Sequence, residues 1–364
     1  MKTVGIDARL YFQTGVGTYL RNLLNNLQNI NTGEIRFYIY VMKNDSKNIN
    51  FNNSYFIKRE VSYRWHSLSE QFGFLKTLYQ DNLDLIHFTY FSFPIFYQKK
   101  FIATIHDLTP LFFKTGKAST KNFLIYQFKH LAFRLVLENQ VKKSKKIITP
   151  SMTVKNQLIN IFGKKISRKT VSIYEGVNED LIKTKENESL KPRFKKNFFI
   201  YVGNFYPHKN IERLIEAFLK LREDVQLILI GPNDFFAKRL VQSFKRTELK
   251  KKIIFYHNPT SSDLVFFYKN ALALIHPSLS EGFGLPLLEA AYFGCPIIAS
   301  DIPVFKELLD ERYLSFNPLS VDDIKEKIML ILHQKVEFDY RQIIKKYSFK
   351  KMAKETSKIY KELL

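Results

Sequence analysis

Short runs of apolar residues alternate along this chain with longer segments in which apolar positions recur at helical spacing. The short runs predict β-strands, and a lysine-rich, polar stretch at Lys183–Asn197 separates them into two series. The first series comprises Thr3–Asp7, Ile35–Met42, Leu83–Phe88, Phe101–Ile105, Ile147–Pro150 and Val171–Tyr174. The second comprises Phe198–Val202, Val225–Ile230, Ile253–Tyr256, Ala273–His276 and Pro296–Ser300. Between the strands, segments such as Ile211–Leu221 place their apolar residues on one helical face.

Strands that are apolar almost throughout, and that alternate with helices, are typical of parallel sheets covered on both faces. Because the pattern begins twice, we expect an α/β protein with two Rossmann-like domains, whose parallel sheets face an interdomain cleft. The expected domains are residues 1–185 and 196–345, and a terminal helix at 346–364 is expected to pack back on the first domain. A ligand of such a pair would lie at the carboxyl ends of the strands, facing the cleft.

The composition indicates a globular cytoplasmic protein. Hydrophobic residues make up 45% of the 364 residues and charged residues 25%, which excludes a disordered chain. The single cysteine, Cys295, excludes an internal disulfide and a cysteine-based zinc cluster. No stretch approaches the roughly 18 to 20 apolar residues of a membrane-spanning helix. The segment MKTVGIDARLYF at the start has no secretory hydrophobic region and is expected to form the first strand.

The net charge of +23 is concentrated in the first half of the chain. Residues 1–200 hold 32 of the 57 Lys and Arg but only 14 of the 34 Asp and Glu, and Glu138 is the single acid within 111–170. Such a region attracts nucleic acid, anionic lipid or a phosphorylated substrate. In Lys121–Lys146 the bases interleave with aromatic and aliphatic residues, as in a helix resting on a membrane surface. A core helix with a solvated basic edge would have the same composition and is the alternative. We expect peripheral attachment to an anionic membrane.

The most informative stretch is H-P-S-L-S-E-G-F-G-L-P-L-L-E, residues 276–289. Its histidine ends a strand, and Pro286 suits the first turn of a helix because the N–H that proline lacks would have no partner there. Gly282 and Gly284 let the backbone approach a ligand, and free amides at a helix start favour an anion such as a diphosphate. Glu281 and Glu289 could accept hydrogen bonds from the hydroxyls of a sugar and a ribose. A capping loop followed by an exposed glutamate is the structural alternative.

A second cluster, Y-V-G-N-F-Y-P-H-K-N at residues 201–210, again combines a strand end, a glycine turn and a helix start. Lys209 near that start would give a phosphate a point charge beside free amides. On its own, Lys209 could equally be a solvated lysine on a turn. Together with the first cluster, on the same expected domain, it predicts a site for a nucleoside diphosphate.

These motifs resemble the retaining glycosyltransferases of family 4, especially mannosyltransferase-like bacterial members. The resemblance runs through nearly the whole chain and rests on V-G-I-D-A-R-L with a G-V-G loop, D-L-I-H-F, T-I-H-D-L, I-I-T-P-S, V-G-N-F-Y-P-H-K-N, H-P-S-L-S-E-G-F-G-L-P-L-L-E-A and Y-S-F-K-K-M-A-K-E-T. It implies a GT-B fold in which the C-terminal domain binds most of the donor. The implied activity is transfer of a hexose from a nucleotide sugar to a glycan or lipid-linked acceptor with retention.

The resemblance also implies roles for individual residues. Three are implied in catalysis: His106 facing the sugar, Glu281 contacting the donor sugar and Lys209 holding the diphosphate. The residues implied in donor binding are Asn204, Gly282, Phe283, Gly284, Leu285 and Glu289, the last on the ribose hydroxyls. Gly15 and Gly17 would allow donor or acceptor to approach the first helix. Many family members have arginine at the position of Asn204, and an asparagine brings no charge to the phosphate.

The chain contains no D-x-D pair, which transferases that hold a diphosphate through a divalent metal typically need. We therefore expect metal-independent activity without a cofactor, in which positive side chains and helix amides take the place of the metal. His87, His208 and His276 are expected to have structural or supporting roles. Arg64-Trp65-His66, which contains the only tryptophan, could contact an acceptor or could pack in the interior.

The motif variant at 202–210 favours GDP-mannose as donor, by resemblance only, for cell-envelope polysaccharide or glycolipid synthesis. A transferase using a UDP-sugar, a nucleotide-sugar epimerase and a sugar phosphorylase of the same fold are the alternatives. A nucleic-acid-binding protein is suggested by charge alone, without an RNA or DNA motif, and we expect no nucleic-acid partner. A dehydrogenase is disfavoured because T-G-V-G-T lacks the full G-x-G-x-x-G and the acidic residue about 20 positions on.

Overall fold

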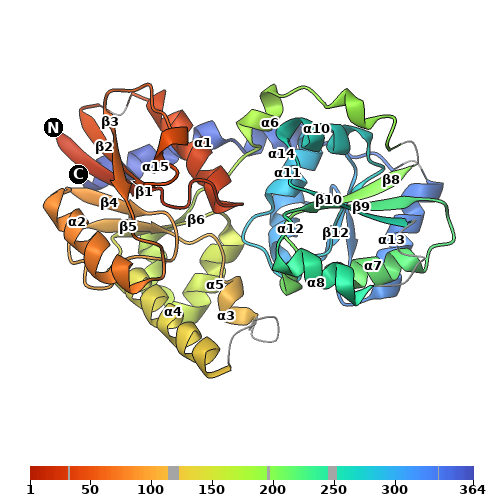
Figure 1. Ribbon diagram of the computed structural model, residues 1–364, viewed down its shortest axis with the longest axis horizontal. Helices are drawn as coiled ribbons and strands as arrows, with labels where there is room; N and C mark the ends of the chain where they lie inside the picture. The colour runs from red at the N-terminus through yellow and green to blue at the C-terminus, as the bar shows by residue number, and fades with distance from the viewer. Residues whose placement is uncertain (32, 114–122, 195–196, 245–251, 335) are drawn as a thin grey trace. The chain divides into compact units, whose positions relative to one another are not determined.

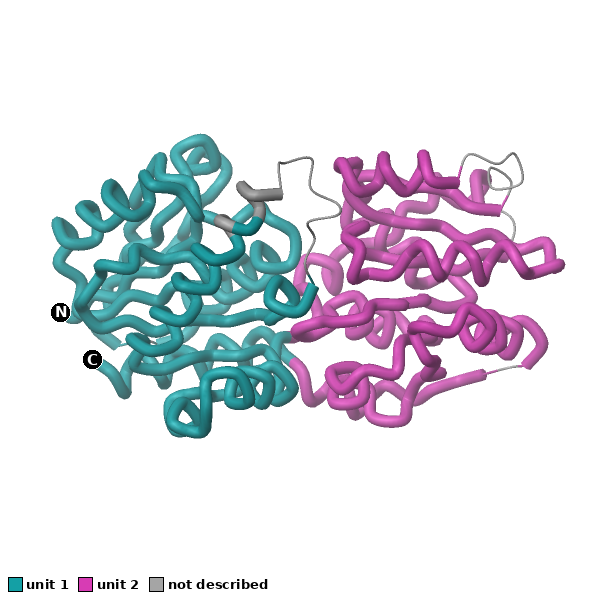
Figure 2. Tube along the Cα trace, turned by 90° about the horizontal axis from the view of Figure 1, so that it is seen from below, with its two compact units in different colours: residues 1–175, 348–364 teal, residues 176–347 magenta. Residues whose placement is uncertain are grey.

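The computed structural model describes the chain except for residues 32, 114–122, 195–196, 245–251 and 335, and except for the side chains of residues 123–126, 128 and 129. It divides the chain into two compact units (Figure 2): unit 1 contains residues 1–175 and 348–364, and unit 2 contains residues 176–347. Each unit is built on one parallel sheet with helices on both faces (Figure 1), which confirms the predicted α/β class. No helix among the described residues combines the length and apolarity needed to cross a bilayer.

Unit 1 has a seven-stranded sheet in the order β3-β2-β1-β4-β5-β6-β7, with every neighbouring pair parallel. Its strands are β1 (Lys2–Asp7), β2 (Ile35–Met42), β3 (Phe56–Val61), β4 (Leu85–Phe88), β5 (Phe101–Thr104), β6 (Lys146–Thr149) and β7 (Thr170–Ser172). Its helices are α1 (Val16–Gln28), the π-helix η2 (Glu70–Phe74), α2 (Leu75–Gln80), α3 (Thr109–Phe112), α4 (Phe123–Lys143), α5 (Met152–Phe162) and α15 (Phe349–Leu363). Helices α1 and α15 cover one face of the sheet, and α2, α4 and α5 cover the other (Figure 1).

The last helix of the chain, α15, is part of unit 1. Ser348 caps its amino end by accepting a hydrogen bond from the amide of Lys351. The helix packs against α1 and buries Tyr360, whose hydroxyl lies 2.7 Å from Nδ1 of the buried His87 on β4. Burial lowers the pKa of His87 to about 3, so its ring is neutral and can accept or donate within the core.

Unit 2 has a six-stranded sheet in the order β10-β9-β8-β11-β12-β13, again parallel throughout. Its strands are β8 (Phe198–Val202), β9 (Gln226–Gly231), β10 (Ile253–His257), β11 (Leu274–His276), β12 (Ile297–Ser300) and β13 (Leu314–Phe316). Its helices are α6 (Glu179–Lys183), α7 (Ile211–Leu219), α8 (Phe235–Ser243), α10 (Ser261–Asn270), α11 (Leu285–Tyr292), α12 (Pro303–Leu309), α13 (Val321–His333) and α14 (Arg341–Lys346). Helices α7, α8 and α13 share a core cluster with one face of the sheet.

The division between the units lies between Glu175 and Gly176, ahead of the polar stretch at which the sequence pattern places the joint. Residues after Gly176 already pack on unit 2, because Leu181 and Leu190 are buried and α6 contacts α10. The backbone N–H of Asn187 donates to the Ser262 carbonyl, and its side-chain amide donates to Asp263. Polar composition therefore does not mark the boundary here.

Two strands, β3 and β13, are absent from the predicted series. Both are edge strands of their sheets, and each has exposed positions where a central strand would be buried. β3 carries Lys58, Arg59 and Glu60 in its middle, so it does not show the continuous apolar run by which the other strands are recognised. Charged residues on an edge strand also discourage pairing with another chain.

Candidate active site

In unit 2, the loops after β8 and β11 meet at an ion pair between Lys209 and Glu281. The Nζ of Lys209 lies 2.5 Å from Oε1 of Glu281, and the backbone N–H of Leu279 donates to the His208 carbonyl, which joins the two loops. Oε1 of Glu281 also accepts from Nε2 of His276 at 3.0 Å and from the hydroxyl of Ser278 at 2.7 Å. Because these strands are parallel neighbours, their carboxyl ends bring together residues far apart in sequence.

The donors around Glu281 keep its carboxylate ionised. Burial alone would raise the pKa of Glu281, but the Lys209 ammonium and the hydrogen bond from His276 outweigh burial and hold that pKa well below its ordinary value. All three side-chain donors act on Oε1, and the described residues supply no hydrogen bond to Oε2. The second carboxylate oxygen is therefore in a position to accept from a ligand hydroxyl.

The amino end of α11 follows directly on this loop. Gly284 immediately precedes the helix with φ at 121°, a conformation that favours glycine, and no side chain caps this helix end. The ring of Phe283 is buried and lies edge-on to Tyr347, so a donor contact at Phe283 would have to come from its backbone. Asn204, in the loop after β8, has a buried Oδ1 with no hydrogen-bond partner among the described residues. The edge of the sheet thus presents main-chain and amide groups suited to an anion.

Glu289 lies on the buried side of α11. Its Oε2 accepts from the hydroxyl of Tyr268 on α10 at 2.8 Å, and the described residues offer Oε1 no hydrogen bond. Burial raises the pKa of Glu289 to about 7, partly offset by the bond from Tyr268. At this site a small change in surroundings decides whether the carboxyl group is charged at neutral pH.

His106, in unit 1, follows β5 and has a polar neighbour at each ring nitrogen. Nε2 lies 2.9 Å from the Thr89 carbonyl, and since a carbonyl can only accept, this nitrogen carries a proton. Nδ1 lies 3.4 Å from a carboxylate oxygen of Glu175, which is buried after β7. Tyr19 of α1 packs edge-on against the imidazole, with ring centroids 4.8 Å apart. The Nε2–H of His106 is thereby fixed as a hydrogen-bond donor within unit 1.

The two glycines near α1 differ in their surroundings. Gly15 has φ at 70° and open space where a β-carbon would lie, so the backbone there can be approached closely. A β-carbon on Gly17 would lie 2.5 Å from the carbonyl oxygen of Tyr11, which is sterically forbidden. Gly17 is therefore required by the packing of α1 against the loop before it, whether or not a ligand binds.

The family models divide the chain between them. Residues 14–181 match the model "Glycosyltransferase Family 4", and residues 182–351 match "Glycosyl transferases group 1". The chain belongs to these glycosyltransferases. The boundary between the two matches, at residues 181 and 182, lies close to the division between units 1 and 2.

Curated relatives of this glycosyltransferase include two bacterial enzymes. It is 33% identical over 238 residues to the O-antigen chain mannosyltransferase RfbU of Salmonella typhimurium, an alignment that spans 65% of this chain and 62% of that protein. It is 26% identical to the O-antigen chain mannosyltransferase B of Escherichia coli over 72% of this chain and 70% of the relative. Among solved structures, the sucrose-phosphate synthase of Thermosynechococcus elongatus superposes with a TM-score of 0.77 at 18% identity, covering 100% of this chain and 99% of the other. That likeness shows the GT-B fold.

The residues that sequence analysis assigned to the donor side lie in unit 2 of the glycosyltransferase, whereas His106, Gly15 and Gly17 lie in unit 1. The structure brings Lys209 and Glu281 into contact, with His276 as a supporting donor. Two neighbours of these residues were not predicted from the sequence: Glu175, which lies beside His106, and Tyr268, which donates to Glu289. Glu175 directly follows a predicted strand, which was the available signal, whereas Tyr268 sits in an apolar helix that gives none. No three His, Cys, Asp or Glu side chains gather as potential metal ligands in the described parts of the chain.

Proposed function

We propose that this chain transfers mannose from GDP-mannose to a glycan or lipid-linked acceptor with retention of configuration, in the synthesis of a cell-envelope polysaccharide or glycolipid. The observation that carries the proposal is the contact of Lys209 with Glu281 at the carboxyl edge of one sheet, beside the uncapped start of α11. This arrangement offers a cation and main-chain amides to a diphosphate and a carboxylate oxygen to a sugar. The O-antigen mannosyltransferases among the relatives support mannose as the sugar.

In the proposed mechanism the acceptor hydroxyl attacks on the face from which the diphosphate departs. Retaining hydrolases use two carboxylates about 5 Å apart around the anomeric carbon, and Glu281 is the one carboxylate that we place near the sugar. A leaving-group oxygen would therefore help to take the acceptor proton. Lys209 and the amides at the start of α11 would stabilise the charge that develops on the diphosphate. The absence of a D-x-D pair from the sequence supports a reaction that needs neither metal nor cofactor.

The donor is tested by thermal unfolding with GDP, UDP, ADP, CDP and dTDP and their common sugar conjugates, in excess EDTA. We expect GDP and GDP-mannose to raise the melting temperature most. The shift is measurable because a ligand at 100 times its Kd adds about 2.7 kcal/mol to the free energy of unfolding. Transfer is expected to proceed at full rate in EDTA. A larger shift with UDP or UDP-sugars would replace GDP-mannose by a UDP-sugar within the same proposal. If no nucleotide shifts the melting temperature, the donor site drawn around Lys209, Glu281 and Glu289 is wrong.

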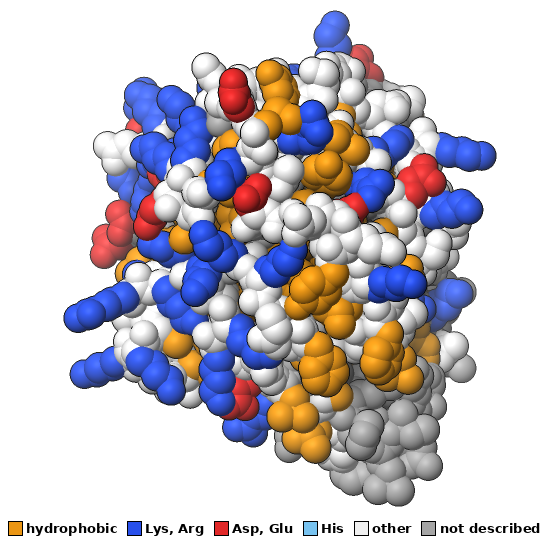
Figure 3. Space-filling model, turned by 90° about the vertical axis from the view of Figure 1, so that its left-hand side faces the viewer, with side chains coloured by type: hydrophobic (Ala, Val, Ile, Leu, Met, Phe, Trp, Pro, Cys, Tyr) orange, Lys and Arg blue, Asp and Glu red, His pale blue; other side chains and the backbone are white. Residues whose placement is uncertain are grey.

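We further propose that unit 1 attaches peripherally to the inner face of an anionic membrane. Figure 3 shows a face of the molecule on which Lys and Arg predominate and hydrophobic side chains gather in the lower part. On α4, Leu131 and Leu135 lie one turn apart with 55% and 51% of their surface exposed, and Arg134 between them is exposed as well. Exposed leucines beside basic residues suit the boundary between headgroups and acyl chains. The side chains of Phe123, Leu124, Tyr126, Phe128 and Lys129, which also motivated this hypothesis, lie outside the described residues.

Sedimentation with vesicles tests this attachment. The wild-type protein is expected to sediment with phosphatidylglycerol-containing vesicles at low salt and to be released as salt screens the basic residues. The double variant Leu131→Gln/Leu135→Gln should sediment much less, whereas Leu319→Gln, at an equally exposed leucine of unit 2, should behave as wild type. Absence of sedimentation by the wild type at low salt would rule the attachment out.

A further inference from the structure

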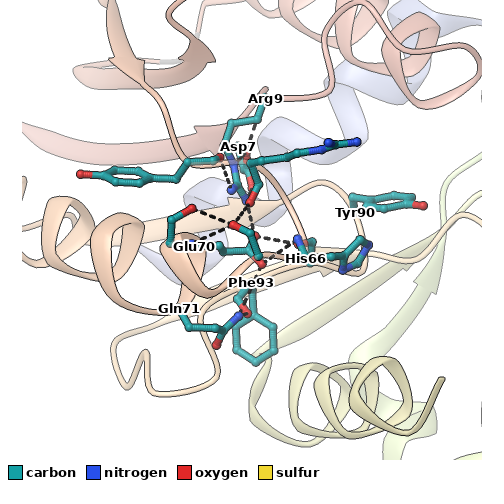
Figure 4. Close-up of polar contacts among 12 residues, drawn as sticks. Asp7, Arg9, His66, Glu70, Gln71, Tyr90 and Phe93 are labelled. Atoms are coloured by element: carbon teal, nitrogen blue, oxygen red, sulfur yellow. Dashed lines mark hydrogen bonds and ion pairs between the residues drawn. The ribbon is translucent and has the colours of Figure 1, made fainter. Parts of the chain in front are cut away.

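A buried arginine lies between two carboxylates at the carboxyl end of β1 (Figure 4). Nε and Nη2 of Arg9 donate to the two carboxylate oxygens of Asp7 at 2.8 and 2.7 Å, and Nη2 also reaches Oε1 of Glu70 at 2.6 Å. Nη1 donates to the Tyr63 carbonyl at 3.0 Å. All three charged side chains are buried. Because removing Arg9 would leave two buried carboxylates without their cation, the arginine holds this cluster together, and through it the loop after β3 is joined to the end of β1.

Glu70 in turn holds the backbone of His66. The amide of His66 lies 3.1 Å from Oε2 of Glu70 and 3.1 Å from the hydroxyl oxygen of Ser92, and that hydroxyl donates to Oε1 of Glu70 at 2.6 Å. His66 has φ at 56°, the left-handed region that residues with a side chain rarely adopt. A strained conformation persists only where its surroundings determine it. The buried cluster thus sets the position of His66, which is exposed as a residue while its ring also packs against the rings of Phe91 and Phe133.

The imidazole of His66 lies next to the ring of Tyr90, with centroids 5.8 Å apart, beside the carboxylate cluster (Figure 4). Tyr90 is half-buried and directly follows Thr89. Thr89 has two bonds in this network: its carbonyl accepts from His106, and its hydroxyl donates to the Asp7 carbonyl at 2.5 Å. The same connected set of hydrogen bonds therefore positions the ring pair and the implied catalytic histidine within one unit.

We propose that His66 and Tyr90 form the subsite for a pyranose ring of the acceptor, an inference that rests on the proposed function. Tyrosine combines a rigid apolar face with a polar tip, and a pyranose presents an apolar C–H face with hydroxyls at its edge. The ring of Tyr90 stacks on that face, and the imidazole of His66 contacts the hydroxyls.

Two variants test the subsite without dismantling the buried cluster. Tyr90→Leu keeps apolar bulk against the core and removes the aromatic face. His66→Asn removes the ring and keeps the left-handed backbone, which asparagine tolerates. Tyr55→Leu is the matched control, since Tyr55 is an exposed tyrosine of the same unit that precedes the amino end of β3. Each variant is first shown to be folded by its melting temperature.

The probes are methyl α-mannoside, methyl β-glucoside, methyl β-galactoside and methyl N-acetyl-β-glucosaminide, whose binding is measured by saturation-transfer NMR. At least one is expected to bind wild type and Tyr55→Leu alike, and to bind Tyr90→Leu and His66→Asn at least tenfold more weakly. Undiminished binding by both variants, or no binding of any glycoside by wild type, overturns the subsite. The nucleotide melting shifts are recorded on the same proteins: a failure of the proposed function removes them from all four, whereas a failure of the subsite leaves them unchanged.

Discussion

Replacement of Lys209 by alanine is expected to lower kcat for sugar transfer at least tenfold, a loss of about 1.4 kcal/mol or more of transition-state stabilisation. The leaving diphosphate gains negative charge as the glycosidic bond breaks, and an ammonium group fixed beside it stabilises that charge without reorganisation. The position of Nζ is fixed by the 2.5 Å contact with Glu281. Glu281→Gln is expected to lower kcat by a similar factor, because it weakens that contact and the carboxylate contact with the sugar.

Activity and stability must be separated in these variants. Removing Lys209 deprives a buried carboxylate of its cation, which raises the pKa of Glu281 from its strongly lowered value and destabilises the fold. Kinetics are therefore compared only between proteins shown to be folded by their melting curves. Lys220→Ala, at a half-exposed lysine just after α7 that pairs with Asp322, is the control and should keep wild-type rates. A folded Lys209→Ala enzyme with an unchanged kcat would disprove the assignment.

Glu289→Gln is expected to weaken nucleotide binding at least tenfold at pH 8 and, at the same pH, to stabilise the unliganded protein. Two consequences follow from one buried carboxyl group, whose pKa is raised to about 7. Ribose hydroxyls need an ionised carboxylate as a strong acceptor, so nucleotide affinity of the wild type should fall as pH decreases through 7. The affinity of Glu289→Gln should not show this pH dependence.

The stability effect has a definite sign. The folded state holds the Glu289 proton more tightly than the unfolded chain, whose glutamates have the ordinary pKa of 4.5. Wild-type stability therefore decreases as pH rises above 4.5, and the loss is complete once pH exceeds 7. A shift of this size corresponds to an upper limit of roughly 3 kcal/mol. Urea unfolding should show Glu289→Gln equal to wild type near pH 4.5 and more stable at pH 8.

The exposed Glu216 on α7 provides the control for this experiment. Glu216→Gln should neither stabilise the protein nor alter nucleotide binding. A stability difference between Glu289→Gln and wild type that is the same at both pH values would show that packing, and not ionisation, is responsible.

Most strands could be predicted because burial of a parallel sheet on both faces demands local apolar runs. β2 and β8 have the bounds that the sequence indicates, and the other predicted strands differ by a few residues at their ends. The edge strand β3 was not predicted because three charged residues interrupt its apolar run. The loops around Lys209 and Glu281 were also predictable, since glycines and proline at a strand-to-helix turn leave a local signature.

By itself the sequence determined that this chain folds into two parallel α/β units and indicated which loops are candidates to carry its chemistry, because hydrophobic spacing and turn residues act over a few positions. Only the tertiary structure decided the partners of the charged groups. Arg9 and Glu70 are 61 residues apart and Lys209 and Glu281 are 72 apart. The order of strands in each sheet determines which loops become neighbours at its carboxyl edge, and that order depends on packing across the whole unit. The burial that raises the pKa of Glu289 and the approach of Glu175 to His106 arise from the same kind of long-range packing.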